Sequence, residues 1–217
     1  MRADPCGSTL TILRDFEVDP ARLAAAFRHI GAPTIRSVVV AYRTIGVHHE
    51  PQAWDPAWIA EANHLVESMP SHREALHKIP ICYELGEDFS RVCDQLELAP
   101  AELIALHTAG QYRCAAIGFC PGFAYLEGLP DRLAGLDRLS APRTRVPAGS
   151  LGITGKQCAV YPACVPGGWN LIGVCPLRIV DVERGFFPIQ AGDQIRFFAI
   201  SKGQFNQMVD KPLGSEL

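Results

Sequence analysis

The sequence has no long hydrophobic run. Its apolar stretches stay well short of the roughly 20 residues that a membrane-spanning helix needs. The N-terminal segment carries an acid at Asp4 and lacks the apolar core of a signal peptide. We therefore expect a cytoplasmic protein that does not associate with a membrane.

An excess of positive charge is also missing. The 20 Lys and Arg residues stand against 23 Asp and Glu, which gives a net charge of -3. No chain-wide positive field would collect nucleic acid, so a nucleic-acid partner is not expected. With 48% hydrophobic and 20% charged residues over 217 positions, the chain is typical of a globular protein of one large or two small domains.

The sequence contains no C-x-x-C pair, and no histidine follows His107. A zinc site built from the last five of the eight cysteines therefore lacks its usual spacing and ligands. Several cysteines lie in apolar segments, where a reduced thiol fills core space. We predict free thiols and no metal site.

Acidic residues are absent from positions 138–180, although the same window holds five basic residues. Two explanations are open at this point. The window forms an anion site, or its charges point outward and are balanced in space by acids elsewhere. The five cations are Arg138, Arg143, Arg145, Lys156 and Arg178.

The N-terminal part alternates strand and helix signals. A strand-like stretch begins at residue 8, a helix follows the capping pair Asp19-Pro20, and residues 35–49 are long enough for two β-branched strands. A second pair, Asp55-Pro56, begins another helix, and residues 79–83 form a last strand. The order β-α-β-β-α-β predicts a ferredoxin-like domain over residues 1–85.

The remainder of the chain changes character. Residues 86–110 contain two short helical patterns, which we interpret as a helical connector. Beyond it, strand-like runs are separated by glycine and proline, which predicts a closed or nearly closed β-barrel over residues 111–202. Residues 203–217 have little apolar content and are predicted to form a loosely held tail. The fold class is therefore α+β.

Three motifs of familiar chemistry are incomplete. Residues 152–157 resemble a phosphate-binding loop, but the glycine spacing is too short and Gln157 stands where a hydroxyl is needed. Residues 148–152 resemble a nucleophile elbow, yet no histidine follows them. The run His48-His49-Glu50 lacks the i, i+4 pairing of a zinc protease. Each of these site classes is therefore disfavoured.

What remains is a set of loops rich in glycine and proline, over residues 118–130, 141–162 and 166–173. Glycines beside bulky residues indicate sharp turns or close approach of the backbone, and barrel corners explain some of them. Loops on a rigid barrel often carry binding sites. These loops hold three cations and three aromatic side chains that would serve as walls: Arg143, Arg145, Lys156, Tyr125, Tyr161 and Trp169.

At these residues the chain resembles the allophanate hydrolase subunit 1 family, which includes the B subunit of bacterial ATP-dependent 5-oxoprolinase and an inhibitor of a sporulation histidine kinase. The resemblance is strong over about residues 79–200 and weaker before them, and it implies an α/β domain followed by a cyclophilin-like β-barrel. It rests on IPICYELGEDF (79–89), LIALHTAGQYRCAAIGFCPGFAYLEGLP (103–130), PRTRVPAGSLGITGKQCAVYP (142–162), PGGWNLIG (166–173) and GDQIRF (192–197).

The resemblance implies a subunit that is inactive alone. Relatives act with a hydrolase, the A subunit of 5-oxoprolinase, and with a homologous cyclophilin-like second subunit, of the 5-oxoprolinase C or allophanate hydrolase subunit 2 type. Together they open 5-oxoproline to glutamate with ATP as cofactor, with Mg²⁺ held by the substrate or by a partner. Two alternatives stay open: a subunit of allophanate hydrolase or urea amidolyase type, and a regulatory module that binds and inhibits a sensor histidine kinase.

The resemblance also implies roles for single residues. Opening an unstrained lactam needs a driving force, which ATP supplies by phosphorylating the amide oxygen, and the site then needs cations for phosphate and carboxylate. His107 is the expected titratable base, and Arg143 and Lys156 are the expected catalytic cations. The residues expected to bind substrate or nucleotide are Arg145, Tyr125, Tyr161, Trp169, Gly167 and Gly168.

The chain departs from the family pattern at two places. Where members usually have Ile-Gly-Arg-Thr-Pro, this chain has Val174 and Cys175 in place of the arginine and threonine. Cys158 replaces the usual threonine after Gln157. If the missing arginine binds phosphate in relatives, this chain would bind its partner subunit yet turn over a different substrate or none.

Overall fold

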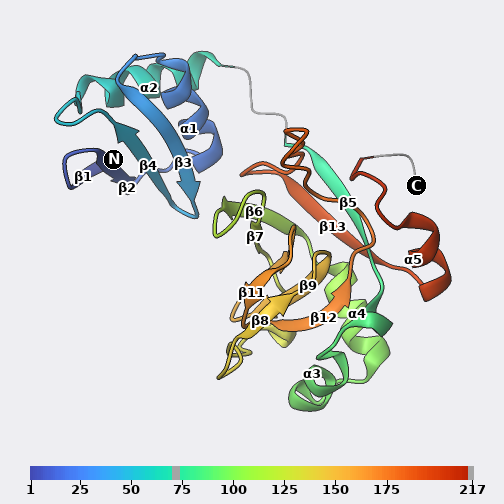
Figure 1. Ribbon diagram of the computed structural model, residues 1–217. Coiled ribbons are helices and arrows are strands. Elements are labelled where there is room, and N and C mark those ends of the chain that lie inside the picture. Colours follow the sequence, from blue (N-terminus) through green and yellow to red (C-terminus); the bar gives the residue numbers. More distant parts are fainter. Residues whose placement is uncertain (70–73, 215–217) are drawn as a thin grey trace. The chain divides into compact units, whose positions relative to one another are not determined.

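The computed structural model describes residues 1–69 and 74–214. The chain divides into two compact units, unit 1 over Met1–Glu74 and unit 2 over Ala75–Leu217 (Figure 1). Both units combine helices and strands, so the predicted class is confirmed in its coarse form, a mixed α and β protein. The boundary lies earlier than the predicted residue 85, and this shift moves one strand from the first unit to the second.

Unit 1 is an antiparallel sheet with strand order β1-β2-β4-β3; helix α1 packs against β3 and β4, and α2 packs against α1. Alternate residues along the strands, such as Leu13, Ile45 and Val47, are fully buried, as expected for a sheet covered on one face. The elements of unit 1 are β1 Arg2–Cys6, β2 Leu10–Arg14, α1 Pro20–His29, β3 Ile35–Ala41, β4 Thr44–His49 and α2 Ala57–Ser68.

The predicted ferredoxin-like order is not what unit 1 contains. Its expected last strand, over residues 79–83, is β5 (Leu76–Ile81), which belongs to unit 2 and pairs in parallel with β13 (Gln194–Ala199). The edge of the unit 1 sheet beside β2 is taken instead by β1, which forms a hairpin with β2. The sequence did not predict β1 because this short edge strand is largely exposed and contains Pro5, so no apolar alternation marks it.

Unit 2 is a ring of strands with helices around it (Figure 1). Three of its strands, β7, β8 and β11, are only three or four residues long. Its remaining elements are η1 Tyr83–Leu85, α3 Phe89–Leu96, α4 Pro100–Ala109, β6 Tyr112–Ile117, β7 Ala124–Glu127, η2 Asp131–Leu133, β8 Arg143–Val146, β9 Ser150–Thr154, β10 Gln157–Val160, β11 Val165–Gly167, β12 Asn170–Val174 and α5 Lys202–Met208.

The strand ring closes on itself. Its order is β5-β13-β6-β7-β10-β9-β12, and every pair except β5 with β13 is antiparallel. The last step joins Cys82, which follows β5, to Val174 of β12, because each residue donates its N–H to the carbonyl oxygen of the other at 2.9 and 3.0 Å. The ring agrees with the expectation of a closed barrel, while the cyclophilin-like character stays a prediction.

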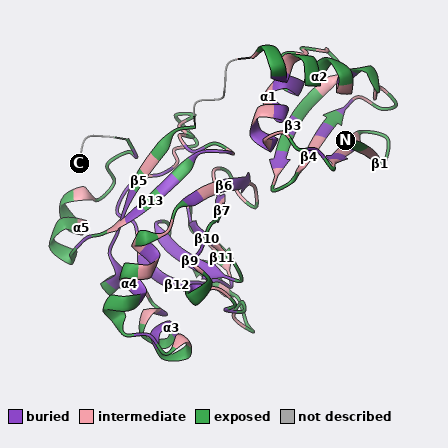
Figure 2. Cartoon of the chain, turned by 180° about the vertical axis from the view of Figure 1, so that it is seen from behind, coloured by how far each residue is buried: buried purple, intermediate pink, exposed green. Residues whose placement is uncertain are grey.

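Two hydrophobic clusters lie on opposite faces of the ring strands. Inside the ring, residues such as Ile153, Cys158 and Ile172 belong to the main core. Their sequence neighbours point outward, since side chains alternate along a strand. This outer cluster consists of Phe123, Val146, Ala159, Tyr161, Trp169 and Leu171. In Figure 2 the ring strands are correspondingly coloured largely as buried.

The predicted connector and tail are both parts of unit 2. Helices α3 and α4 occur where the sequence predicted them, but Val92 and Leu103 are buried in the main core, so this segment is not a linker. The segment predicted as a loose tail begins with α5, which has a capping box at Ser201, and Leu213 is also buried in the core. Residues 215–217 of the predicted tail lie outside the described residues.

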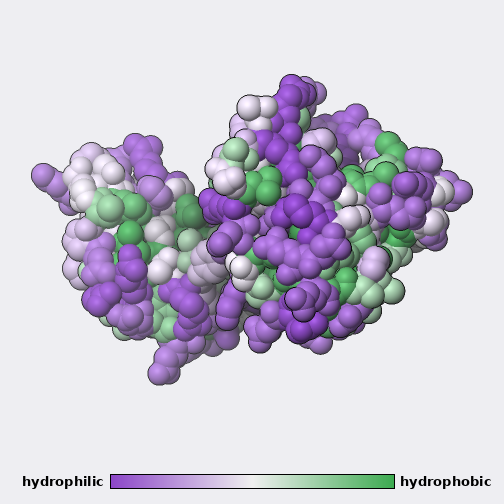
Figure 3. All heavy atoms as spheres, turned by 90° about the horizontal axis from the view of Figure 1, so that it is seen from below, coloured by the Kyte–Doolittle hydropathy of each residue, from purple (hydrophilic) through white to green (hydrophobic). Residues whose placement is uncertain are grey.

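The described part of the chain contains no helix long and apolar enough to cross a membrane. The face shown in Figure 3 is mainly hydrophilic, with hydrophobic residues in small separate groups. Among the exposed large hydrophobic residues, Phe119 has a relative exposure of 60%.

The cysteines give a first test of this packing. All eight are free thiols, and only Cys6 and Cys164 are exposed. Burial raises the pKa of Cys114 and of Cys175 to about 12, so their thiolate fraction near neutral pH is very small. We expect a thiol-reactive dye to label two sites rapidly in the native protein, Cys120 more slowly, and all eight in denaturant. Replacing Cys6 and Cys164 by Ser should remove the rapid phase, and a rapid phase that persists would contradict the described burial.

Candidate functional site

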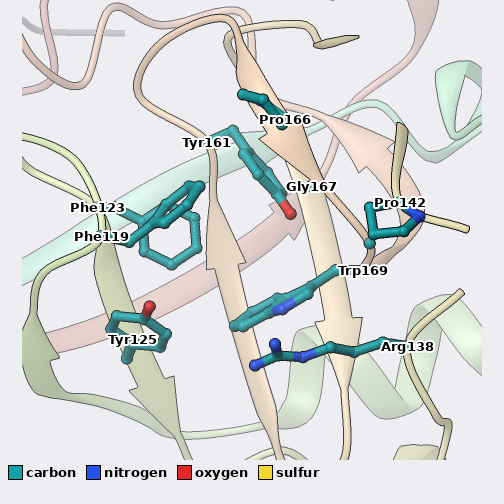
Figure 4. A pocket seen from close by; sticks show the side chains of 10 residues that line it. Phe119, Phe123, Tyr125, Arg138, Pro142, Tyr161, Pro166, Gly167 and Trp169 are labelled. Carbon is teal, nitrogen blue, oxygen red and sulfur yellow. The ribbon is translucent and has the colours of Figure 1, made fainter. Parts of the chain in front are cut away.

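A pocket of about 230 Å³ opens on the outer face of the strand ring, beside the small sheet of β8 and β11 (Figure 4). It lies over the outer hydrophobic cluster and brings together several of the predicted site residues. Its lining consists of Phe119, Phe123, Tyr125, Arg138, Pro142, Tyr161, Pro166, Gly167, Gly168 and Trp169. Tyr125, Tyr161, Gly167, Gly168 and Trp169 were predicted, and they come from separate stretches of strand and loop.

The aromatic walls of the pocket are organised around Phe123, which is almost fully buried. Its ring meets Tyr161 and Trp169 edge to face, with centroid distances of 5.2 and 5.6 Å. Tyr125 lies 4.9 Å from the same ring. Edge-to-face contacts of this kind hold aromatic side chains in fixed orientations. The pocket therefore has a rigid, apolar interior that suits a small flat ring.

The hydroxyl group of Tyr161 is a polar group within these walls. A Cβ atom added at Gly167 would lie 2.5 Å from that oxygen, so the close approach of the β11 backbone requires glycine there. Burial raises the pKa of Tyr161, while a hydrogen bond from the Trp169 backbone and the positive charges of Arg138 and Arg143 act in the opposite direction. The phenol is therefore protonated at neutral pH and can donate a hydrogen bond.

Arg138 supplies the charge of the pocket. Of the residues that line it, all of which belong to the described part of the chain, Arg138 is the one with a charged side chain. It is exposed, and in Figure 4 its side chain extends alongside the Trp169 indole. The sequence placed Arg138 in the acid-free window but did not select it, because a loop residue carries no periodic signal that shows which way it points.

Phe119 stands at the rim of the pocket in an uncommon backbone conformation. Its φ angle is 69°, and the Cys120 N–H donates to the Gly118 carbonyl oxygen at 2.9 Å, which closes a tight γ-turn around it. Positive φ is unfavourable for a bulky residue. The turn nevertheless places an exposed aromatic ring 5.3 Å from that of Phe123, at the entrance to the pocket.

Comparison with known proteins places this chain in a family. The profile described as carboxyltransferase domain, subdomain C and D, matches residues 9–187, which is most of the chain. The chain belongs to this family. The B subunit of 5-oxoprolinase from Bacillus subtilis is 42% identical to this carboxyltransferase-domain chain over 132 residues, which cover 59% of the chain and 55% of the relative. The match therefore spans about half the length of that curated relative.

Solved structures share the fold of this carboxyltransferase-domain chain. The crystal structure of TTHA0988 aligns with a TM-score of 0.73 and 32% identity, and the alignment covers 88% of this chain and 40% of that one. The urea amidolyase of Kluyveromyces lactis aligns with a TM-score of 0.66 over 94% of this chain and 15% of its own length. At 13% identity the second likeness concerns the fold alone.

Arg143, an expected catalytic cation of this carboxyltransferase-domain chain, is already engaged with protein groups. Its Nη2 donates to both carboxylate oxygens of Asp88 at 2.8 and 2.9 Å, and its Nε donates to Glu87 at 3.1 Å. Its Nη1 donates to the Trp169 carbonyl oxygen at 3.4 Å. Arg143 does not line the pocket. Although positions 138–180 contain no acid, the charge of Arg143 is thus balanced by Glu87 and Asp88 from the segment before α3.

His107, the expected base, lies elsewhere. Its side chain is fully buried, and the pocket lining does not include it. Its Nδ1 atom lies 2.7 Å from the Tyr83 hydroxyl, and its ring packs 4.8 Å from that of Phe197. Burial lowers the pKa of His107 to about 3. This placement does not fit a group that exchanges protons with a substrate, because α4 directs His107 and Leu103, one turn apart, into the same core.

Lys156 and Arg145 also lie outside the pocket lining. Lys156 is exposed in the turn between β9 and β10, whereas Tyr161 follows the opposite end of β10, roughly 17 Å away along an extended strand. Arg145 is exposed on β8. In the sequence these cations fall in the same loops as the aromatic residues. The two ends of a strand, however, lie at opposite ends of a sheet, so the cations and the aromatic residues are separated in space.

The two departures from the family pattern lie away from this pocket. Val174 and Cys175 lie at the end of β12, by the closing bridge of the ring, where they line a different, mostly apolar cavity. Cys158 is fully buried inside the ring. Within the described residues no group of three or more His, Cys, Asp or Glu side chains is placed to hold a metal ion.

Proposed function

We propose that this chain is a subunit of a heteromeric, ATP-dependent 5-oxoprolinase and that the aromatic pocket binds the lactam. The supporting observation is the chemistry of the pocket, taken together with 42% identity to a protein named as the B subunit of 5-oxoprolinase. 5-Oxoproline is a flat five-membered lactam with a single carboxylate. The walls around Phe123 suit the ring, and Arg138 suits the carboxylate.

In the proposed reaction, water adds to the lactam carbonyl carbon, the ring C–N bond breaks, and the nitrogen leaves as the amine of glutamate. In the same cycle ATP phosphorylates the lactam oxygen and leaves as ADP, and a second water releases that phosphate, so two waters are consumed for each glutamate formed. This chain would hold the carboxylate through Arg138 and orient the ring between Phe123 and Trp169. The protonated Tyr161 hydroxyl would donate a hydrogen bond to an oxygen of the lactam. Fixed orientation of this kind contributes a large part of many enzymatic rate enhancements.

The pocket does not fit ATP itself. Its volume of about 230 Å³ is small for a nucleotide, since clefts that enclose drug-sized ligands occupy about 300–1,000 Å³. A triphosphate also needs several cations or a metal, and the lining offers Arg138 alone. We therefore place the ATP site, with its Mg²⁺, on a partner. The partners proposed are a hydrolase of the 5-oxoprolinase A type and a homologous second cyclophilin-like subunit.

Reconstitution tests this proposal. The chain is mixed with the two partners, the hydrolase and the second cyclophilin-like subunit, and 5-oxoproline-dependent release of phosphate and glutamate is measured. We expect turnover that requires all three proteins. Arg138→Ala should raise KM for 5-oxoproline roughly 10- to 100-fold, because a charge-assisted hydrogen bond contributes about 1.5–3 kcal/mol.

Arg132→Ala is the matched control, since Arg132 is an exposed arginine on η2 that does not line the pocket. Its KM should equal that of the wild type. Absence of turnover in a mixture where an established set of subunits works would overturn the proposal. The alternatives, a histidine kinase inhibitor and a subunit of allophanate hydrolase or urea amidolyase type, would then be tested by supplying the kinase or allophanate.

A further inference from the structure

Trp169, the largest wall of the pocket, lies between Gly168, whose carbonyl oxygen accepts from the Leu139 N–H at 2.7 Å, and β12, which pairs with β9. Trp169 follows Pro166-Gly167-Gly168, and two adjacent glycines leave the backbone many accessible conformations. The contacts on the pocket side are ring contacts with Phe123 and Tyr125. The orientation of the indole also depends on what holds the Trp169 backbone on the side away from these rings.

A buried carboxylate provides that support. Asp88, whose side chain is 8% exposed, accepts a hydrogen bond from the Leu171 N–H at 2.7 Å, and its own N–H donates to the Leu171 carbonyl oxygen at 2.8 Å. The same carboxylate receives the Arg143 guanidinium through both oxygens. Arg143 in turn donates to the Trp169 carbonyl oxygen. Asp88 and Arg143 together thus hold the backbone at Trp169 and at Leu171.

A neighbouring contact acts on the residue between them. Arg91 lies 3.3 Å from Asp88 Oδ1 and donates to the Asn170 side-chain oxygen at 2.6 Å. Each of residues 169, 170 and 171 is therefore tied to the segment around the start of α3 or to Arg143, which that segment holds. None of these groups lines the pocket, apart from Trp169 itself.

We infer that Asp88 and Arg143 are positioning residues, which fix the Trp169 wall and so determine how well the pocket holds a flat ring. They act through Trp169 and do not touch the ligand. The expected effect on turnover rests on the function proposed above, whereas the expected effect on Trp169 does not.

The test uses the full chain labelled with 5-fluorotryptophan and observed by fluorine NMR. The three tryptophans give three resonances, and Trp169→Phe identifies the one from Trp169. In Asp88→Asn, which retains the shape of the side chain but removes its charge, we expect the Trp169 resonance to shift or broaden while those of Trp54 and Trp58 stay in place. In the reconstituted system KM for 5-oxoproline should rise about tenfold with little change in kcat.

Asp193→Asn is the matched control. Asp193 is a similarly buried carboxylate of unit 2, bound to His77 and to the backbone N–H groups of Ala75 and Gln190. Its replacement should leave the Trp169 resonance and KM unchanged even if the unfolding midpoint falls.

Arg143→Lys is the second variant, because it retains the charge, but a single ammonium group cannot contact Asp88, Glu87 and the Trp169 carbonyl oxygen together as the three guanidinium nitrogens do. It should disturb the Trp169 resonance less than Asp88→Asn does. If Asp88→Asn does not fold, Arg143→Lys is used as the test variant in its place. An unchanged Trp169 resonance in the folded variants would overturn the inference. If the wild-type mixture does not turn over 5-oxoproline but the Trp169 resonance changes in Asp88→Asn as expected, the proposed function is overturned and the positioning role stands.

Discussion

Unit 2 is expected to lose about 4 kcal/mol of stability as the pH falls from 6.5 toward 3, and most of this loss should disappear in His107→Phe. The pKa of His107 is about 3 in the folded protein and near 6.5 in an unfolded chain. A lowered folded pKa stabilises the fold above the unfolded value, and this contribution is lost as the pH drops, because the unfolded state binds the proton first. The Nε2 atom of His107 has no hydrogen-bond partner in the core, so nothing there compensates a charge.

The measurement is the unfolding midpoint in denaturant at a series of pH values, followed at Trp169, the single tryptophan of unit 2. At neutral pH the variant should be less stable by about 1–2 kcal/mol, since the Tyr83 hydroxyl loses its partner. At low pH it should become the more stable of the two proteins. Carboxylates titrate in both proteins and cancel in the comparison. Parallel loss of stability in the two would show that His107 does not carry the effect.

Gly86→Ala is expected to destabilise unit 2 by about 1–3 kcal/mol. A Cβ atom there would lie 2.5 Å from the Ile172 carbonyl oxygen and 2.7 Å from the Gly173 nitrogen. Both are backbone atoms of β12, and they cannot turn aside as the end of a flexible side chain would. The φ angle of Gly86 is -71°, an ordinary value for alanine, so the cost comes from the contact alone.

The same substitution should also disturb the site, because Gly86 stands two residues before Asp88. Pushing this segment away from β12 would loosen the bonds between Asp88 and Leu171. The unfolding midpoint and the Trp169 fluorine resonance measure the two effects. Gly203→Ala is the control, since Gly203 lies in the exposed helix α5, where an added Cβ would meet only the Ser201 hydroxyl oxygen at an ordinary 3.8 Å, and alanine there should stabilise slightly. Equal stabilities of Gly86→Ala and the wild type would contradict the close packing of the segment before α3 on the ring.

Much of the local structure could be predicted from the sequence. Asp19 accepts a hydrogen bond from the Arg22 N–H at 3.0 Å, so the first helix begins where the Asp-Pro pair predicted it. Helices α3 and α4 also follow their sequence patterns. The strand β5 was recognised as well, but its partner was not. Pairing of β5 with β13 joins residues more than 100 positions apart, and no local pattern identifies a partner at that distance.

The site divides in the same way. Tyr125, Tyr161 and Trp169 were predicted from aromatic residues beside glycines, and the structure brings them to one pocket. The cations were selected by their positions in the loops, and that selection did not include Arg138, which lines the pocket. Whether an arginine faces a pocket or a carboxylate depends on which residues pack behind it. For Arg143 that partner is Asp88, 55 positions earlier in the chain.

The sequence by itself determined helices α1 to α4, most of the strands, the change from α/β to β composition, and the aromatic and glycine residues that line the pocket. These features follow from short-range rules of capping, alternation and backbone freedom, which operate within a few residues. Only the tertiary structure decided that β5 closes the ring, that His107 is buried, and that Arg138 rather than Arg143 faces the pocket. Those outcomes depend on contacts between distant segments, where burial and charge pairing are settled by the whole fold.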